Sequence, residues 1–100
     1  MEYTLMTHIR RLVIDVLKPH EPSTLEFAQQ VSEAESVAGV NASVIELDRE
    51  VQNVKFTIEG ESIDYDTVEA IIEDAGGSVH SVDQIACGEY IVEDAPTPQD

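Results

Sequence analysis

The chain has 100 residues and a formal net charge of −16 at pH 7, from 21 acidic and 5 basic side chains. This length predicts one domain, and 42% apolar residues suffice for one core of modest size. The acidic balance excludes most nucleic-acid-binding roles, which need a basic surface to displace counterions from phosphates. We therefore expect no nucleic-acid partner.

Targeting features are not recognised in the sequence. Residues 1–7 lack a basic run followed by a long apolar stretch, and no window approaches the roughly 18 apolar residues of a membrane span. The single cysteine, Cys87, cannot form an internal disulfide, so nothing argues for secretion. These features predict a soluble cytoplasmic protein without a membrane partner.

The acidic excess has two interpretations: a partly disordered acidic protein, or adaptation to the salt-rich cytoplasm of an archaeon. Like charges repel over roughly 10 Å at about 0.1 M salt but only about 3 Å at about 1 M, so salt relieves self-repulsion. The acids lie between periodic apolar residues, and the only lysines are Lys18 and Lys55, which favours salt adaptation. We expect partial unfolding or dissociation below about 0.5 M salt.

The first half of the chain predicts a strand, a helix and a second strand. Branched apolar residues alternate with other residues over 8–18, which is typical of a strand with one buried face. Ser23 followed by Glu26 is a capping-box pattern, and the apolar stripe after it has helical spacing. This helix should end near Ser36, and a second strand should cover 40–48.

The second half predicts a third strand, a second helix and a fourth strand. Residues 54–58 alternate strictly, and residues 68–75 carry apolar side chains at i, i+3, i+4 and i+7. Gly76-Gly77 supplies a left-handed helix cap. The fourth strand should cover 79–86, and residues 89–92 either extend it or pair elsewhere.

This order of elements predicts a ferredoxin-like βαββαβ sandwich of the α+β class. Right-handed crossovers place both helices on one face of a four-stranded antiparallel sheet. The domain should span 9–92, preceded by an extension, 1–8, and followed by a mobile acidic tail, 93–100. One sheet face is left open to bind a ligand or another copy of the chain.

Several stretches of this sequence resemble the archaeal domain-of-unknown-function 211 family. They are RRLVIDVLKPHEPS (10–23), GVN (39–41), ELDRE (46–50), VKFTIEG (54–60) and GGSVHSVD (76–83). The resemblance covers residues 9–92 and implies a ferredoxin-like fold, an archaeal source and a ring-like or other homo-oligomer. It implies no established activity. The heavier acidic bias departs from the family pattern and fits a haloarchaeal member; the extension through His8 has no assigned role.

Acidic residues are candidates for a metal site on the open sheet face. Asp15 lies in the first predicted strand, on the face opposite the residues that we expect to be buried. If the second strand has the corresponding phase, Glu46 and Asp48 project from the same face, and His80 joins them from the fourth strand. Converging carboxylates suit Ca²⁺ or Mg²⁺, which prefer oxygen ligands. The alternative is a solvated polar face, or salt bridges to basic neighbours.

The loop between the first strand and the first helix is a second candidate site. In this fold that loop lies where related modules bind metals or small ligands, and a helix start can receive an anion. Its candidate ligand residues are Lys18, His20 and Ser23. The alternative is that Pro22 and Ser23 only begin the helix. The acidic loop 59–66 lacks the EF-hand spacing, and Asp64 or Asp66 in it is interpreted as a helix cap.

No catalytic motif supports an enzyme. His80, Ser81 and Asp83 share one strand, where neighbouring side chains point to opposite faces and cannot form a relay. The leading hypothesis is a non-enzymatic, homo-oligomeric structural or regulatory module. The alternative is a sensor of a divalent metal or small ligand, with Ca²⁺ or Mg²⁺ on the open face or at subunit interfaces. The third hypothesis is a weak enzyme built on the same scaffold.

Overall fold

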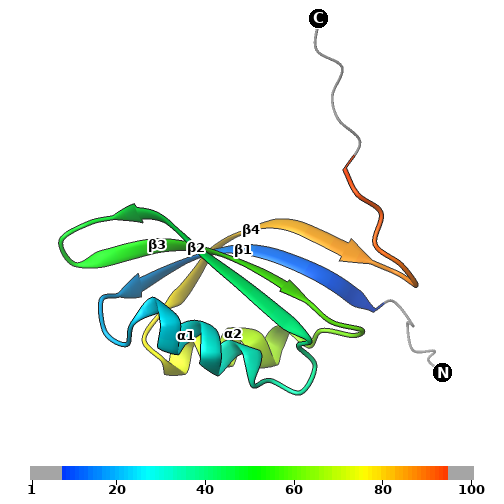
Figure 1. The fold of residues 1–100 in the computed structure, drawn as a ribbon, viewed down its shortest axis with the longest axis horizontal. Helices are drawn as coiled ribbons and strands as arrows, with labels where there is room; N and C mark the ends of the chain where they lie inside the picture. Colours follow the sequence, from blue (N-terminus) through cyan, green and yellow to red (C-terminus); the bar gives the residue numbers. More distant parts are fainter. Residues whose placement is uncertain (1–7, 95–100) are drawn as a thin grey trace, which may run out of the picture.

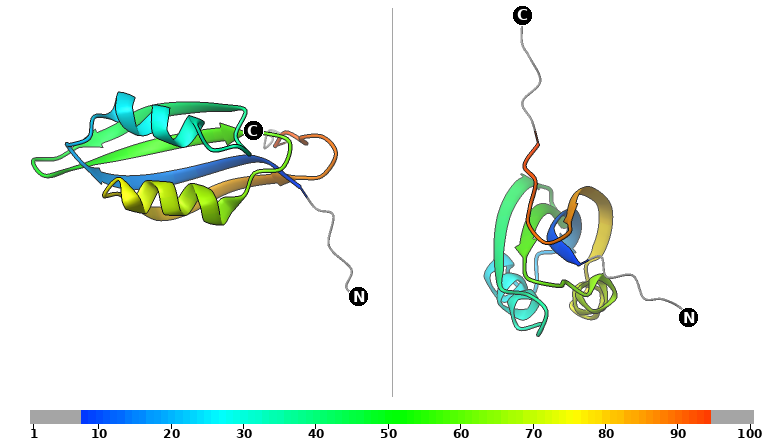
Figure 2. Two further views of the ribbon diagram at one scale, coloured as in Figure 1. Left: turned by 90° about the horizontal axis from the view of Figure 1, so that it is seen from below. Right: turned by 90° about the vertical axis from the view of Figure 1, so that its right-hand side faces the viewer.

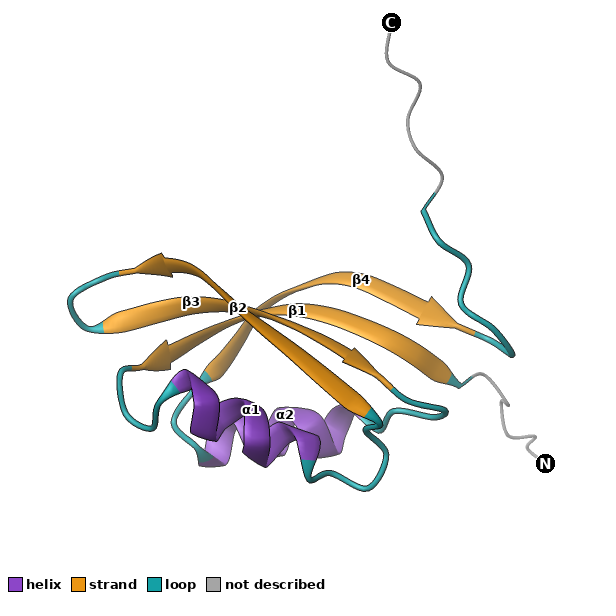
Figure 3. Cartoon of the chain, in the orientation of Figure 1, coloured by secondary structure: helices purple, strands orange, loops and turns teal. Residues whose placement is uncertain are grey.

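In the computed structural model, residues 8–94 are described, and they form one antiparallel sheet covered by two helices. The elements are β1 (Ile9–Pro19), α1 (Thr24–Ser32), β2 (Gly39–Leu47), β3 (Val51–Glu59), α2 (Tyr65–Asp74) and β4 (Ser78–Cys87) (Figure 1). The strand order is β2-β3-β1-β4, and every neighbouring pair is antiparallel. Both helices lie on one face of the sheet (Figure 3). The predicted ferredoxin-like fold is confirmed.

The helix-covered face of the sheet forms the core. On β1, Leu12, Ile14 and Val16 are buried and lie opposite buried apolar residues of β3. Phe27 of α1 is also fully buried, and its ring centroid lies 5.8 Å from that of Phe56. Burial of these apolar side chains is the dominant favourable contribution to folding.

The two helices begin where the sequence predicts them. The Ser23 side chain accepts a hydrogen bond from the Glu26 amide, and the Glu26 carboxylate accepts one from the Ser23 amide, which completes the capping box. At α2 the cap is Asp64, whose carboxylate accepts a hydrogen bond from the Thr67 amide. Asp64, not Asp66, therefore caps the second helix.

The two adjacent glycines that follow α2, Gly76 and Gly77, are required for different structural reasons. Gly76 has φ of +96°, the left-handed conformation that glycine adopts without strain. Gly77 has no positive φ, but a Cβ there would lie 2.8 Å from Cζ of Phe27. The predicted left-handed cap is confirmed for Gly76, whereas Gly77 is required by close packing.

Three departures from the prediction are larger than one residue. Helix α1 ends at Ser32 because the amides of Glu33 and Ala34 bond to carbonyls three residues back, which tightens the last turn. Strand β3 begins at Val51, earlier than predicted. Residues 89–92 neither extend β4 nor pair elsewhere.

The outer strands β2 and β4 leave apolar side chains exposed at both edges of the sheet. Val44 on β2 and Val82 on β4 are 46% and 43% exposed. Val44 pairs with the buried Val54, so it lies on the helix-covered side of the sheet and not on the open face. The β2–β3 turn reaches past the helices (Figure 2).

Neither α1 nor α2 is long and apolar enough to cross a bilayer.

Candidate functional site

The open face carries Asp15 near its centre, as predicted. Its strand partners are Lys55 on β3 and Ser81 on β4. The Ser81 hydroxyl donates a hydrogen bond to Asp83 Oδ1 at 2.9 Å and lies 3.5 Å from Asp15 Oδ2. Directly opposed residues of antiparallel strands share a face, so Asp15 has a basic and a hydroxyl neighbour there.

The other three predicted metal residues do not join Asp15 in one protomer. Glu46 is on β2, opposite Asn53, and Asp48 follows β2 in the turn to β3. His80 lies on β4, at the opposite edge of the sheet, where the pairing register shifts. Within residues 8–94, no group of three His, Cys, Asp or Glu side chains is arranged to hold a metal ion.

The predicted ligand loop uses its side chains for internal contacts. Ser23 caps α1, as described above. His20 Nε2 lies 2.9 Å from the carbonyl oxygen of Asp48, which links this loop to the β2–β3 turn. Lys18 is fully buried. The three residues therefore do not converge on a shared space.

Lys18 continues the buried phase of β1 after Val16 and closes one end of the core. Its Nζ donates to the Pro19 carbonyl at 2.6 Å and to Gln52 Oε1 at 3.0 Å. The same atom lies 5.4 Å from the Phe27 ring centroid, within the range of a cation–π contact. Among the described residues no carboxylate forms an ion pair with it. Burial lowers the pKa of Lys18, and the charge of Glu21 partly opposes this shift.

We expect Lys18→Met to remove a pH dependence of stability. Because the folded-state pKa of Lys18 is lowered, the unfolded chain binds more protons between that pKa and the ordinary value of 10.5, and stability rises with pH in that window. Denaturant unfolding at pH 7 should place the variant within about 1 kcal/mol of the parent or above it. As the pH rises through the alkaline range toward the ordinary lysine pKa of 10.5, the parent should gain stability relative to the variant.

The control for this substitution is Lys55→Met, which removes an exposed lysine from the open face. Tyr65, whose pKa is raised mainly by burial, destabilises the fold at high pH in the parent and in both variants, so it cancels in the comparison. A Lys18→Met curve parallel to the parent throughout that alkaline range would contradict a lowered pKa.

Arg11 is the most strongly paired cation on the open face. Its Nε donates to Glu59 Oε2 at 2.8 Å, and Nη1 and Nη2 donate to the two carboxylate oxygens of Glu93 at 2.9 and 3.0 Å. These hydrogen bonds raise the pKa of Arg11. Hydrogen bonding to Arg11, and then its charge, lower the pKa of Glu93. The pair therefore brings a residue beyond β4 onto the sheet.

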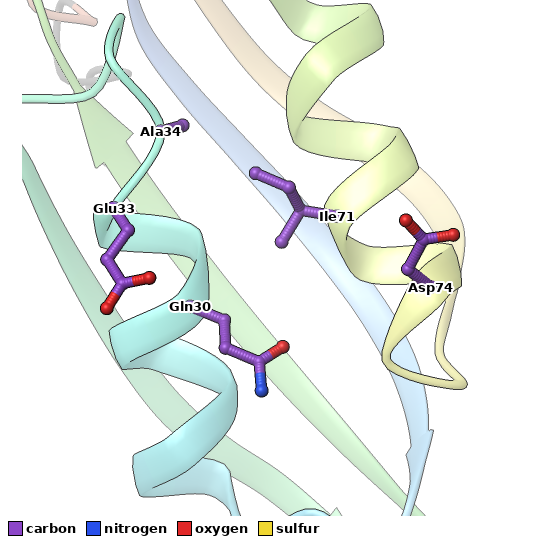
Figure 4. A pocket seen from close by; sticks show the side chains of 5 residues that line it. All are labelled: Gln30, Glu33, Ala34, Ile71 and Asp74. Carbon is purple, nitrogen blue, oxygen red and sulfur yellow. The ribbon is translucent and has the colours of Figure 1, made fainter.

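A groove of about 390 Å³ lies between the two helices. Its lining residues are Gln30, Glu33, Ala34, Ile71 and Asp74. Figure 4 shows the Gln30 and Ile71 side chains pointing into the space between α1 and α2, whereas the Glu33 carboxylate points away. Because its two carboxylates do not converge, the groove presents no ion site.

A second hollow, of about 450 Å³, lies where β1 begins, and sequence reasoning missed it. Arg10 Nε donates to the Gly60 carbonyl at 3.3 Å, and its Nη1 donates to the carbonyls of Gly88, at 3.2 Å, and Glu89. His8 Nδ1 lies 3.0 Å from Ser62 Oγ beside it. The lining comes from three distant segments; the only sequence signal was a pair of adjacent arginines in an acidic chain.

Comparisons with known proteins find a matching family and a similar protein. The model of the DUF211 family, described as uncharacterized ArCR, matches residues 10–100. The chain is also similar to the uncharacterized protein MJ0319 of Methanocaldococcus jannaschii. The two are 46% identical over 95 residues, which cover 95% of this chain and 98% of the relative. Neither description assigns an activity.

Proposed function

This chain belongs to the DUF211 family, and we propose that it acts as a non-enzymatic structural or regulatory module that assembles with copies of itself through the two edges of its sheet. The observation that carries the proposal is that both edges of the sheet are unpaired. Within the described residues, β2 and β4 each have one unpaired side, and exposed unpaired strands readily pair with another chain.

The two edges match in chemistry. Following the register across the sheet, Val44 is level with Val79, and Ala42 is level with Val82. These four residues all lie on the helix-covered side. If β2 of one copy lies beside β4 of the next, apolar side chains of both edges meet on that side. Such cross-strand pairs are the unit of sheet stabilisation.

The strand directions also match. Strand β2 runs antiparallel to β3, β3 to β1, and β1 to β4, so β2 and β4 run in opposite directions. A β2 edge placed beside the β4 edge of a second copy would form an ordinary antiparallel pair. This contact joins two different surfaces, so it is heterologous, and it produces a ring when the rotation closes. Pairing of two β2 edges would give a dimer instead.

The test is the absolute mass of the full chain, measured by light scattering on a sizing column in about 1 M KCl, where screening is strong. A single mass of several subunits is the expected result. A monomer of 11.0 kDa across the column would overturn the proposal.

A salt requirement is the second expectation from the charge. With a net charge of −16, self-repulsion opposes both folding and assembly until salt screens it. We expect the melting temperature to rise between about 0.1 M and about 1 M KCl. Choline chloride at equal ionic strength is the control for a specific effect of potassium. An unchanged melting temperature would contradict salt adaptation.

Metal binding is a second candidate function, and the placement of the predicted ligands favours it only between copies. Glu46 is level with Ser78 through Asn53 and Leu17, and His80 lies two residues farther along β4. The proposed edge pairing would therefore bring Glu46 of one copy near His80 of the next. Loss of the multi-subunit mass with chelator, and its recovery with Ca²⁺ or Mg²⁺, would support a metal there; an equal mass under both conditions would exclude a structural one.

A further inference from the structure

The segment after β4 turns back toward the open face of the sheet. Gly88 makes the turn with φ of +117°, and its amide donates to the His8 carbonyl at 2.9 Å. Arg10 holds the same turn through the carbonyls of Gly88 and Glu89. Figure 1 shows the following residues rising on the side of the sheet opposite the helices. The root of this segment is therefore fixed by backbone hydrogen bonds.

The far end of the segment is held by side chains of the open face. Glu93 accepts the two-pronged hydrogen bond from Arg11, and Asp94 Oδ2 accepts a hydrogen bond from Gln84 Nε2 at 3.2 Å. Gln84 pairs with Val13, next to Arg11 on the same sheet face. The contacts at this end thus come from polar and charged groups of β1 and β4.

Apolar burial anchors the segment only at Ile91, which is half-buried. Tyr90 and Val92 are each 71% exposed, although they lie between the fixed root and the charged end. Glu93 is 67% exposed at its side chain, so solvent and salt reach the Arg11–Glu93 pair. Exposed ion pairs contribute little stability and weaken as salt screens them.

We infer that residues 88–94 form a strap that closes over the Arg11 end of the open face in dilute solution and opens as salt rises. Opening frees the guanidinium fork of Arg11, which suits a carboxylate or phosphate group. The pairing of β1 with β3 runs from Arg11–Glu59 to Pro19–Val51 and does not involve the strap, so the sheet is kept when the strap opens. This switch does not depend on assembly.

The test is the mobility of a spin label on the strap of the full chain. Val92→Cys, made together with Cys87→Ser, gives a single labelling site at an exposed position. In about 0.1 M KCl the label should move slowly; in about 1 M KCl, where the screening length falls from roughly 10 Å to about 3 Å, its correlation time should fall several-fold. Equal mobility at both salt concentrations would overturn the inference.

Two charge-neutralising variants separate the effect of the Arg11–Glu93 ion pair, which acts as the latch of the strap, from general screening of charge by salt. Adding Glu93→Gln should make the label mobile at every salt concentration, because the two-pronged ion pair is lost. Glu89→Gln removes the same charge from the same segment, but Glu89 contacts Arg10 only through its carbonyl. It should leave the salt response unchanged. A label that stays slow in Glu93→Gln, or that is freed equally by Glu89→Gln, would contradict the latch.

Discussion

The variant Val44→Lys should run as a monomer under conditions in which the parent chain assembles. Val44 lies in the middle of the exposed β2 edge, and the proposed contact would bury it against Val79 of the next copy. Burying an unpaired ammonium group there should cost about 2 kcal/mol or more, which is roughly a 30-fold loss of affinity. Val82→Lys places the same charge on the opposite edge and should have the same effect. Light scattering measures both masses.

The isolated folds of these variants should stay intact. Both valines are nearly half exposed, so the new lysine can extend into water, and the monomer's unfolding free energy should change by about 1 kcal/mol or less. The matched control is Leu25→Lys, which introduces the same charge at a 67% exposed position on α1 and on neither edge strand. Leu25→Lys should keep the parent mass. If it dissociates as well, added charge and not the edge is responsible.

The variant Phe27→Ala should lose a large part of its stability. Phe27 is fully buried, stacks near Phe56 and lies beneath the Lys18 ammonium group. Truncating a buried phenylalanine costs about 3–5 kcal/mol, out of a total of about 5–15 kcal/mol for a domain. Loss of the ring also removes the aromatic neighbour of a buried cation. Denaturant unfolding in about 1 M KCl measures the change.

Leu25→Ala is the matched control for this prediction. It truncates a large apolar side chain two residues earlier on the same helix, where 67% of the residue is exposed. Its unfolding free energy should change by about 0.5 kcal/mol or less. Equal losses for the two variants would contradict the assignment of Phe27 to the centre of the core.

The fold was predictable because several local signals agree. Strict alternation in β1 identified Leu12, Ile14 and Val16 as core residues, and the capping box at Ser23 fixed the start of α1. These patterns depend on short-range chemistry, which the chain itself specifies. The same alternation extends to Lys18, so its burial had a signal in the sequence, but a lysine beside a proline resembles a loop residue.

The arrangement of the candidate site was much less predictable. The register shifts between Val44 and Glu46 on β2, and again near His80 on β4, and a bulge changes which side a residue faces. Val44 therefore faces the helices, although Val44 and Glu46 are two residues apart, a spacing that would place both on one face of a regular strand. The Arg11–Glu93 contact joins residues 82 positions apart, and periodicity carries no information about such a pair.

The most direct test of head-to-tail edge pairing is the mass of an equimolar mixture of Val44→Lys and Val82→Lys. Each variant alone has one blocked edge, but the free β2 edge of the second matches the free β4 edge of the first. Heterologous pairing predicts monomers separately and a heterodimer when they are mixed, because both outer edges of that pair are blocked. If the mixture stays monomeric, or if Val82→Lys alone keeps the parent mass, the β2-to-β4 contact is wrong.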